Sequence, residues 1–200
     1  MTHLRRTALA AVCALLPWAA AAQQDTATKP NTAAPAAESK LEMAKPAGVR
    51  GDILAQIQDA ETKLIALAEA TPADKFGWRP ADGVRTIGEV YAHVAGGNYF
   101  LPTFWDVKAP EGVDPRSFEP AAGDKAGTID RMRKSFEHAR GAIARASDAD
   151  LERAVKMFGQ QSTVRGAMMT VATHAHEHLG QAIAYARSNG IVPPWSRGGN

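Results

Sequence analysis

Cysteine is almost absent from this sequence of 200 residues, since the single one is Cys13, inside an apolar run near the N-terminus. Cysteine pairs staple many small exported domains, and cysteine thiolates act as nucleophiles and soft metal ligands. If the N-terminal run is removed, the remaining chain can form neither a disulfide nor a thiolate nucleophile. Any metal ligands in it must then be nitrogen or oxygen atoms.

Long apolar segments are also scarce, and the one at the N-terminus has the form of a secretory signal peptide. Arg5 and Arg6 precede an apolar run over residues 8–21, which closes on three alanines at 20–22. A charged start, a short apolar core and a small-residue cleavage site indicate export, and this core is too short to span a bilayer. No later segment is apolar enough to cross a membrane. We therefore expect residues 1–22 to be a signal peptide and the protein to be periplasmic or secreted.

An excess of charge of one sign is missing as well. The sequence holds 23 basic and 21 acidic residues, and residues 1–22 account for two of the basic residues and none of the acidic ones. The rest of the chain is formally neutral, so its charge favours neither a nucleic acid nor an anionic membrane surface as a partner. Residues 23–46 are rich in Ala, Thr, Pro and Lys and nearly lack large apolar residues, which predicts a flexible linker.

The remaining chain carries apolar residues at helical spacing in four long segments. The segments begin near residues 51, 86, 128 and 162, and each presents one apolar stripe. Such stripes bury themselves against one another, which predicts an all-α fold, a four-helix bundle over residues 47–194. We expect the second helix to run from about Thr86 to Phe104 and the fourth to end near Asn189.

The segments between these helices predict turns and loops. Residues 106–124 contain three prolines, which indicates a long loop between the second and third helices. Residues 152–162 fit either a loop or a short irregular strand. Residues 195–200 form a C-terminal tail.

Three histidines are the most informative residues. His174 and His178 are four positions apart on the fourth expected helix and so share one face, and His93 lies on the second helix. Two imidazoles one turn apart, with a third from a neighbouring helix, can bind one divalent ion and leave it an open position. His176 points elsewhere. The alternative is that each inward imidazole bonds to a backbone carbonyl or a side chain, with no metal.

Other polar side chains near these histidines are candidates for supporting roles. Glu89 lies one turn before His93, and Glu177 adjoins His178; either is a candidate catalytic base or a partner of a ligand, and the alternative for both is a solvated carboxylate. Gln181, one turn after His178 on the same flank, is the preferred hydrogen-bond partner of that ring.

Two further features of the helices lead to expectations. His138 is two positions from Phe136 on the third helix, so we expect it to be solvated and without a role. Gly96 and Gly97 fall inside the second helix, where each glycine costs about 1 kcal/mol relative to alanine. We expect the close approach of another backbone, or room left beside His93, to offset that cost.

Three stretches carry a family resemblance. One is Phe76-Gly77-Trp78-Arg79-Pro80 before a helix beginning Thr86-Ile87-Gly88-Glu89, the second is Tyr91-Ala92-His93-Val94-Ala95-Gly96, and the third is His174-x-x-x-His178-Leu179-Gly180-Gln181. In this order and at this spacing the chain resembles the DinB-like family of bacterial four-helix bundles. The resemblance implies that His93, His174 and His178 bind a divalent metal ion, with zinc or nickel as the candidates.

The resemblance also bears on activity. The wider superfamily includes thiol-dependent S-transferases and a mycothiol-dependent isomerase, and relatives suggest a homodimer. The thiols that these enzymes use are largely cytosolic, so export argues against a thiol transferase. We expect an exported metal-dependent hydrolase or transferase acting on an unidentified small molecule.

Two other functions remain open. One is a non-catalytic bundle that binds a metal or a small apolar ligand, in a pocket lined by aromatic residues of the second helix: Tyr91, Tyr99, Phe100, Phe104 and Trp105. The other is a metal-free scaffold.

Overall fold

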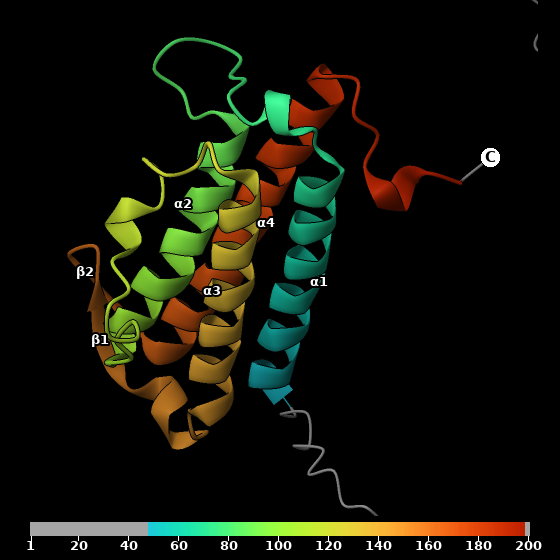
Figure 1. Ribbon diagram of the computed structural model, residues 1–200. Helices are drawn as coiled ribbons and strands as arrows, with labels where there is room; N and C mark the ends of the chain where they lie inside the picture. The colour runs from blue at the N-terminus through green and yellow to red at the C-terminus, as the bar shows by residue number, and fades with distance from the viewer. Residues whose placement is uncertain (1–47, 199–200) are drawn as a thin grey trace, which may run out of the picture. The chain divides into compact units, whose positions relative to one another are not determined.

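The computed structural model describes residues 48–198, and four α-helices make up most of this part of the chain (Figure 1). The helices are α1 (Gly48–Ala70), α2 (Ile87–Phe100), α3 (Lys125–Arg145) and α4 (Val164–Ser188). Both α1 and α2 pack against α3 and α4, so α1 and α2 occupy opposite corners of the bundle. The expected all-α four-helix bundle is confirmed. The signal peptide and the linker that we expect at residues 1–46 lie outside the described residues.

The apolar stripes predicted from the spacing form the core of this bundle. Its largest fully buried side chains come from all four helices and include Ile57, Leu64, Val90, Tyr91, Met132, Phe136, Ile143 and Met168. Burial of each large apolar side chain contributes about 1.5–3 kcal/mol relative to leaving it exposed. One buried polar contact links α2 to α3, where the Asn98 side-chain amide donates to Ser135 Oγ at 3.1 Å.

The helix ends follow from capping chemistry. At the start of α2, Thr86 Oγ1 accepts from the Glu89 N–H and the Glu89 carboxylate accepts from the Thr86 N–H, which makes a capping box. The third helix begins three residues earlier than the spacing predicts, because Asp124 caps it by accepting from the Gly127 N–H. The fourth helix begins near the expected position, and Thr163 caps it by accepting from the Gly166 N–H.

The expected end of the second helix is wrong by one turn. The α-helix stops at Phe100, and Leu101–Trp105 continue as a 3₁₀ helix, η2. Pro102 accounts for the change, because in an α-helix its ring would clash with the carbonyl four residues earlier.

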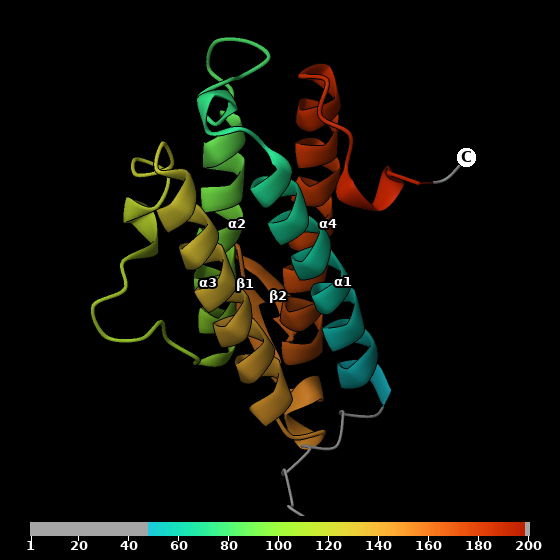
Figure 2. The ribbon, with the colours of Figure 1, turned by 45° about the vertical axis from the view of Figure 1, so that its right-hand side comes forward.

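The connections place a 3₁₀ turn beside α2 and a short hairpin beside η2 and α4. The α2–α3 connection contains a short 3₁₀ turn, η3 (Pro115–Ser117), and loops outward at one side of the bundle (Figure 2). The α3–α4 connection contains a 3₁₀ turn, η4 (Ala149–Glu152), and an antiparallel hairpin of β1 (Ala154–Met157) and β2 (Gln160–Thr163). The hairpin settles the ambiguous segment as strand.

Two short 3₁₀ turns complete the described chain: η1 (Ala73–Lys75) follows α1, and η5 (Pro194–Ser196) contacts α1. Over residues 48–198, no helix is both long enough and apolar enough to cross a membrane.

Candidate metal centre

The three histidines meet between α2 and α4, two helices that pack directly against each other. His93 comes from α2, and His174 and His178 lie on consecutive turns of α4. One nitrogen of each ring lies within 4.8 Å of the other two, and the Nε2 atoms of His93 and His174 are 3.2 Å apart. The structure therefore brings together the three residues that the helical spacing and the family resemblance indicate.

Hydrogen bonds at the far side of two rings fix which nitrogen faces the cluster. His93 Nδ1 lies 2.8 Å from Glu119 Oε1, and His178 Nδ1 lies 2.8 Å from Gln181 Oε1. Both partners offer oxygen acceptors, so each Nδ1 carries the hydrogen and each neutral ring keeps a free lone pair on Nε2. This is the tautomer that a metal-binding histidine needs when its other nitrogen donates to a carboxylate or a carbonyl.

Glu119 is itself held by a bidentate contact with Arg85. Arg85 Nε donates to Oε2 at 3.0 Å and Nη2 donates to Oε1 at 3.1 Å. Burial alone would raise the pKa of Glu119, but the hydrogen bonds from Arg85 and His93 outweigh it and lower that pKa. Glu119 is thus ionised at neutral pH and remains an acceptor for His93. Burial lowers the pKa of His93, against the opposing effect of Glu119, so this ring stays neutral.

The third ring, His174, contacts His93 through Nε2 but has no partner at Nδ1 among the described residues, and the space beside Gly97 positions it. A Cβ added at Gly97 would lie 2.4 Å from His174 Cε1, so only glycine leaves room for the imidazole there. The expectation of room beside His93 is wrong, because the space left by Gly97 is taken by His174. Burial, followed by the neighbouring His178, His93 and Arg85, lowers the pKa of His174 to about 3.

These residues fit a divalent metal ion. Nitrogen ligands about 2.0–2.1 Å from a tetrahedral ion lie about 3.4 Å from each other, close to the 3.2 Å between His93 and His174. All three candidate ligands are nitrogens, and the pKa values of His93 and His174 favour the neutral form that binds metal. The cluster could therefore hold an ion.

The remaining candidates from the sequence lie apart from this cluster or are engaged elsewhere. His176 Nε2 contacts the Gln56 carbonyl on α1 at 3.0 Å, which agrees with its exclusion from the ligands. Glu177 is exposed. Glu89 completes the capping box of α2 and pairs with Arg79 at 3.5 Å. Gln181 contacts His178 as expected.

The expectation for His138 is wrong. Its ring packs on Tyr99 with centroids 4.9 Å apart, and its Nε2 is buried. Burial, with a smaller effect of Arg145, lowers the pKa of His138. The side chain reaches sideways from α3 to α2, because these helices are neighbours and the ring covers the gap between them.

Glu119 and Arg85 are the site residues that sequence reasoning missed. Glu119 follows η3 in the proline-rich connection, and Arg85 precedes the cap of α2. Neither belongs to a periodic pattern, and each gains its role only when the α2–α3 connection folds back on α2.

Two cavities adjoin the cluster, and Glu119 lines both. One, of about 580 Å³, is mainly apolar and has His93 and His174 in its wall. The other, of about 540 Å³, is lined mainly by polar and charged side chains: Arg79, Arg85, Glu89, Gln181 and Tyr185.

Comparison with known proteins identifies the family. The model of the DinB superfamily matches residues 56–182, which is more than half of the chain. The chain belongs to the DinB superfamily. No curated protein matches the sequence.

Solved structures of DinB-like proteins share the fold. A DinB-like protein from Bacillus cereus is 18% identical with a TM-score of 0.62, and the match covers 71% of this chain and 93% of that one. The DinB-like protein YjoA from Bacillus subtilis is 15% identical with a TM-score of 0.55, over 70% and 93% of the two chains. YfiT from Bacillus subtilis, described as a probable metal-dependent hydrolase with an unusual four-helix bundle topology, is 15% identical with a TM-score of 0.58, over 72% and 89%.

Proposed function

We propose that this protein is a metal-dependent hydrolase whose divalent ion is bound by His93, His174 and His178. The observation that carries the proposal is the convergence of three imidazole nitrogens, two of them on rings whose Nδ1 hydrogens are already held by Glu119 and Gln181. The likeness in fold to YfiT supports hydrolysis as the reaction class.

The ligand set favours zinc or nickel. Both ions accept imidazole nitrogen readily, and three protein ligands leave a position for water or substrate. Such an ion supplies Lewis acidity, which activates water and polarises a carbonyl or phosphoryl oxygen. The surrounding residues orient the ligands. Glu119 and Gln181 each accept the Nδ1 hydrogen of the histidine they contact, and Gly97 leaves room for the His174 ring.

Glu119 acts in this proposal as a positioning residue. Both of its carboxylate oxygens accept hydrogen bonds from Arg85, and Oε1 also accepts from His93. A carboxylate with a lowered pKa and three donors is a weak proton acceptor. Neither Glu89 nor Glu177 is a better base, because the first caps α2 and the second is exposed.

Export supports water rather than a thiol as the nucleophile. The signal-like residues 1–22 direct the proposed enzyme to the periplasm or the medium, where the low-molecular-weight thiols of the cytosol are scarce. Mass spectrometry of the protein from its native host should find an N-terminus at or near Gln23 outside the cytoplasm. An intact Met1 in the cytosol would falsify export and restore the transferase as the competing function.

The test of catalysis is a panel of small carboxylic esters, amides and phosphoesters offered to protein purified without an affinity tag. We expect wild-type protein loaded with zinc or nickel to hydrolyse at least one of these classes, a chelator to stop the reaction, and fresh metal to restore it. His93→Ala should be inactive, whereas His176→Ala should match wild type. Metal-loaded protein that binds members of the panel without turning any of them over would establish the alternative, a non-catalytic ligand-binding bundle.

A further inference from the structure

An aromatic cluster stands beside the histidine cluster. Phe158 at the tip of the β1–β2 hairpin packs against Phe104 of η2 and Phe100 at the end of α2, with ring centroids 5.0 and 6.2 Å away. Phe100 and Phe104 lie 5.3 Å apart. Phe158 is nevertheless 66% exposed and Phe100 48% exposed, so a large part of both residues lies in solvent.

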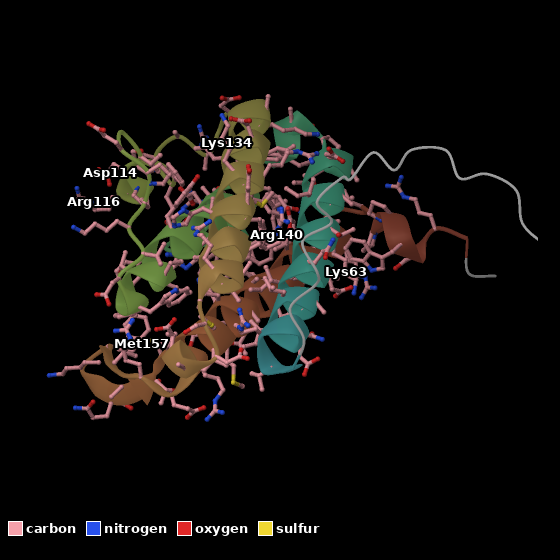
Figure 3. All side chains as sticks on the ribbon, turned by 90° about the horizontal axis from the view of Figure 1, so that it is seen from below. Lys63, Asp114, Arg116, Lys134, Arg140 and Met157 are labelled. Atoms are coloured by element: carbon pink, nitrogen blue, oxygen red, sulfur yellow. The ribbon has the colours of Figure 1, made fainter. Side chains whose placement is uncertain are left out.

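The backbone of Phe158 is unusual for its residue type. Phe158 and Gly159 join the paired residues Met157 and Gln160, and both have positive φ, at 50° and 84°. Two central residues at positive φ define a two-residue hairpin turn in which asparagine or aspartate before glycine is strongly preferred. A phenylalanine there is strained, and an outlier of this kind points to a role for the side chain. Figure 3 labels Met157, the residue directly before this tip.

Phe100 and Phe158 line the apolar cavity, whose wall also contains His93 and His174. The charged side chains at the cavity, apart from Glu119 beside His93, neutralise each other: Arg116 Nε donates to Asp114 Oδ1 at 2.9 Å. Asp114 and Arg116 also extend outward from the α2–α3 connection, as Figure 3 shows. The cavity thus offers an apolar surface, with the Glu119 carboxylate and the imidazole nitrogens at the histidine side.

We propose that this cavity binds the apolar acyl or aryl group of a neutral small substrate, with Phe158 as a specificity-determining wall. The assignment rests on the proposed function, because it takes the histidine cluster as the place where the polar, reacting group of the substrate lies. A volume of about 580 Å³ is within the usual 300–1,000 Å³ of small-molecule sites. Such sites combine an apolar lining with a few convergent polar groups, which here are His93, His174 and Glu119.

A neutral fluorescent probe, N-phenyl-1-naphthylamine, tests the cavity without metal. We expect wild-type protein to bind the probe and Phe158→Asn to bind it about tenfold more weakly, since most of one aromatic contact is lost. Phe158→Leu should fall between the two. The matched control is Val192→Asn, which removes an exposed apolar side chain distant in sequence from the cavity and should bind as wild type does.

Thermal melting separates a ligand contact from damage to the fold. Asparagine suits the turn better than phenylalanine, so Phe158→Asn should melt at or above the wild-type temperature while binding the probe more weakly. Equal probe binding by wild type and Phe158→Asn would overturn the assignment. Failure of wild-type protein to bind the probe would also overturn it, and would be expected if another part of the chain fills the cavity. A probe affinity that falls as protein concentration rises would overturn it too, because a second copy would then cover the cavity.

A series of straight-chain hydroxamates on zinc-loaded protein then distinguishes the cavity from the metal site. Acetohydroxamate has almost no tail and reports on the ion alone, whereas each added methylene should raise affinity about threefold to fourfold if the tail enters the cavity. Phe158→Asn should bind acetohydroxamate normally and lose about half of the gain per methylene. Acetohydroxamate binding without any gain for longer tails would refute the cavity and keep the metal site. Probe binding that depends on Phe158, without acetohydroxamate binding, would keep the cavity and refute the proposed function.

Discussion

At the histidine cluster, side chains from three parts of the chain hold one another in place, whereas the rim of the apolar cavity leaves large apolar side chains in solvent. Glu119 is bonded to Arg85 and His93, and Gln181 to His178. Phe158, by contrast, is exposed on a strained turn. His93, His174 and Phe158 line the same cavity, yet only the histidine cluster is held by a network of side-chain hydrogen bonds. Changes at the cluster should therefore cost both metal and stability, and changes at the rim should cost ligand binding alone.

The largest effect should come from removing one histidine of the cluster. His178→Ala should carry no ion after gel filtration, because two imidazoles cannot replace a three-ligand site. An ion at 100 times its dissociation constant stabilises the fold by about 2.7 kcal/mol, so a chelator should lower the melting temperature of wild type and leave that of His178→Ala unchanged. His176→Ala should keep its ion and should respond to the chelator as wild type does. Equal metal loss in both variants would show that the ligands are wrongly chosen.

A methyl group added at Gly97 should be nearly as damaging as a lost ligand. Gly97→Ala places Cβ 2.4 Å from His174 Cε1, so the ring must move, and we expect metal affinity to fall by about 100-fold. Gly96→Ala is the matched control, since its Cβ meets only the Pro115 carbonyl at 3.6 Å. The control should keep its metal and gain about 1 kcal/mol of stability from alanine in a helix. Competition titration with a zinc indicator measures both; equal affinities would contradict the packing of His174 on α2.

A smaller loss should follow from Glu119→Gln. The neutral amide weakens the contacts to both Arg85 and His93, and loss of such a ligand partner costs about 10–100-fold in metal affinity. Glu177→Gln, on an exposed side chain, should leave affinity unchanged. The same competition titration measures both variants. An unchanged metal affinity in Glu119→Gln would mean that His93 needs no hydrogen-bond partner. A reduced metal affinity in Glu177→Gln would mean that Glu177 supports the site.

At the rim, Phe158→Asn should stabilise the protein slightly. Relief of a positive φ at a bulky residue is worth about 1 kcal/mol, and little packing is lost because the ring is exposed. Urea unfolding of wild type and variant, both with chelator present, provides the measurement. A clear destabilisation would mean that the aromatic cluster supports the fold, and the contrast between rim and cluster would disappear.

The smallest effect concerns acid sensitivity. Burial holds the pKa of His138 below its ordinary value of 6.5 in the folded chain, so below that pH the unfolded chain takes up a proton more readily. Folding stability should therefore fall as the pH drops through 6.5, and His138→Gln should reduce this fall modestly. Urea unfolding at pH 7.5 and pH 5.5, with chelator throughout, tests the difference. Identical pH dependence in the two proteins would show that the ring is solvated after all.

Helical periodicity explains why the three histidines could be predicted from the sequence, whereas the contact between Glu119 and His93 could not. The four-residue step from His174 to His178 survives in any α-helix, and the apolar stripe of α4 fixes which way both rings point. Gln181 was found for the same reason, since one turn of helix links it to His178. Glu119 obeys no such rule, because a proline-rich connection must fold back over α2 before its carboxylate reaches His93.

The contribution of Phe158 to the rim of the apolar cavity could not be predicted from the sequence for a related reason. Residues 152–162 are too short for a clear alternating pattern, so their sequence fits a loop as well as a strand. The expected aromatic pocket lining near the end of α2 is confirmed only in part. Tyr91 and Trp105 are buried away from the cavity, whereas the buried Tyr99 and the half-exposed Phe100 line it. Phe158 completes that wall from a segment more than 50 positions away.

X-ray absorption spectroscopy of zinc-loaded protein, purified without an affinity tag, tests the central claim most directly. With His93, His174 and His178 as ligands, the spectrum should show three imidazoles with nitrogen at about 2.0–2.1 Å from one ion per chain. His93→Ala should lose an imidazole or the ion itself. A spectrum without imidazole scattering, or one that is the same in wild type and His93→Ala, would contradict the account.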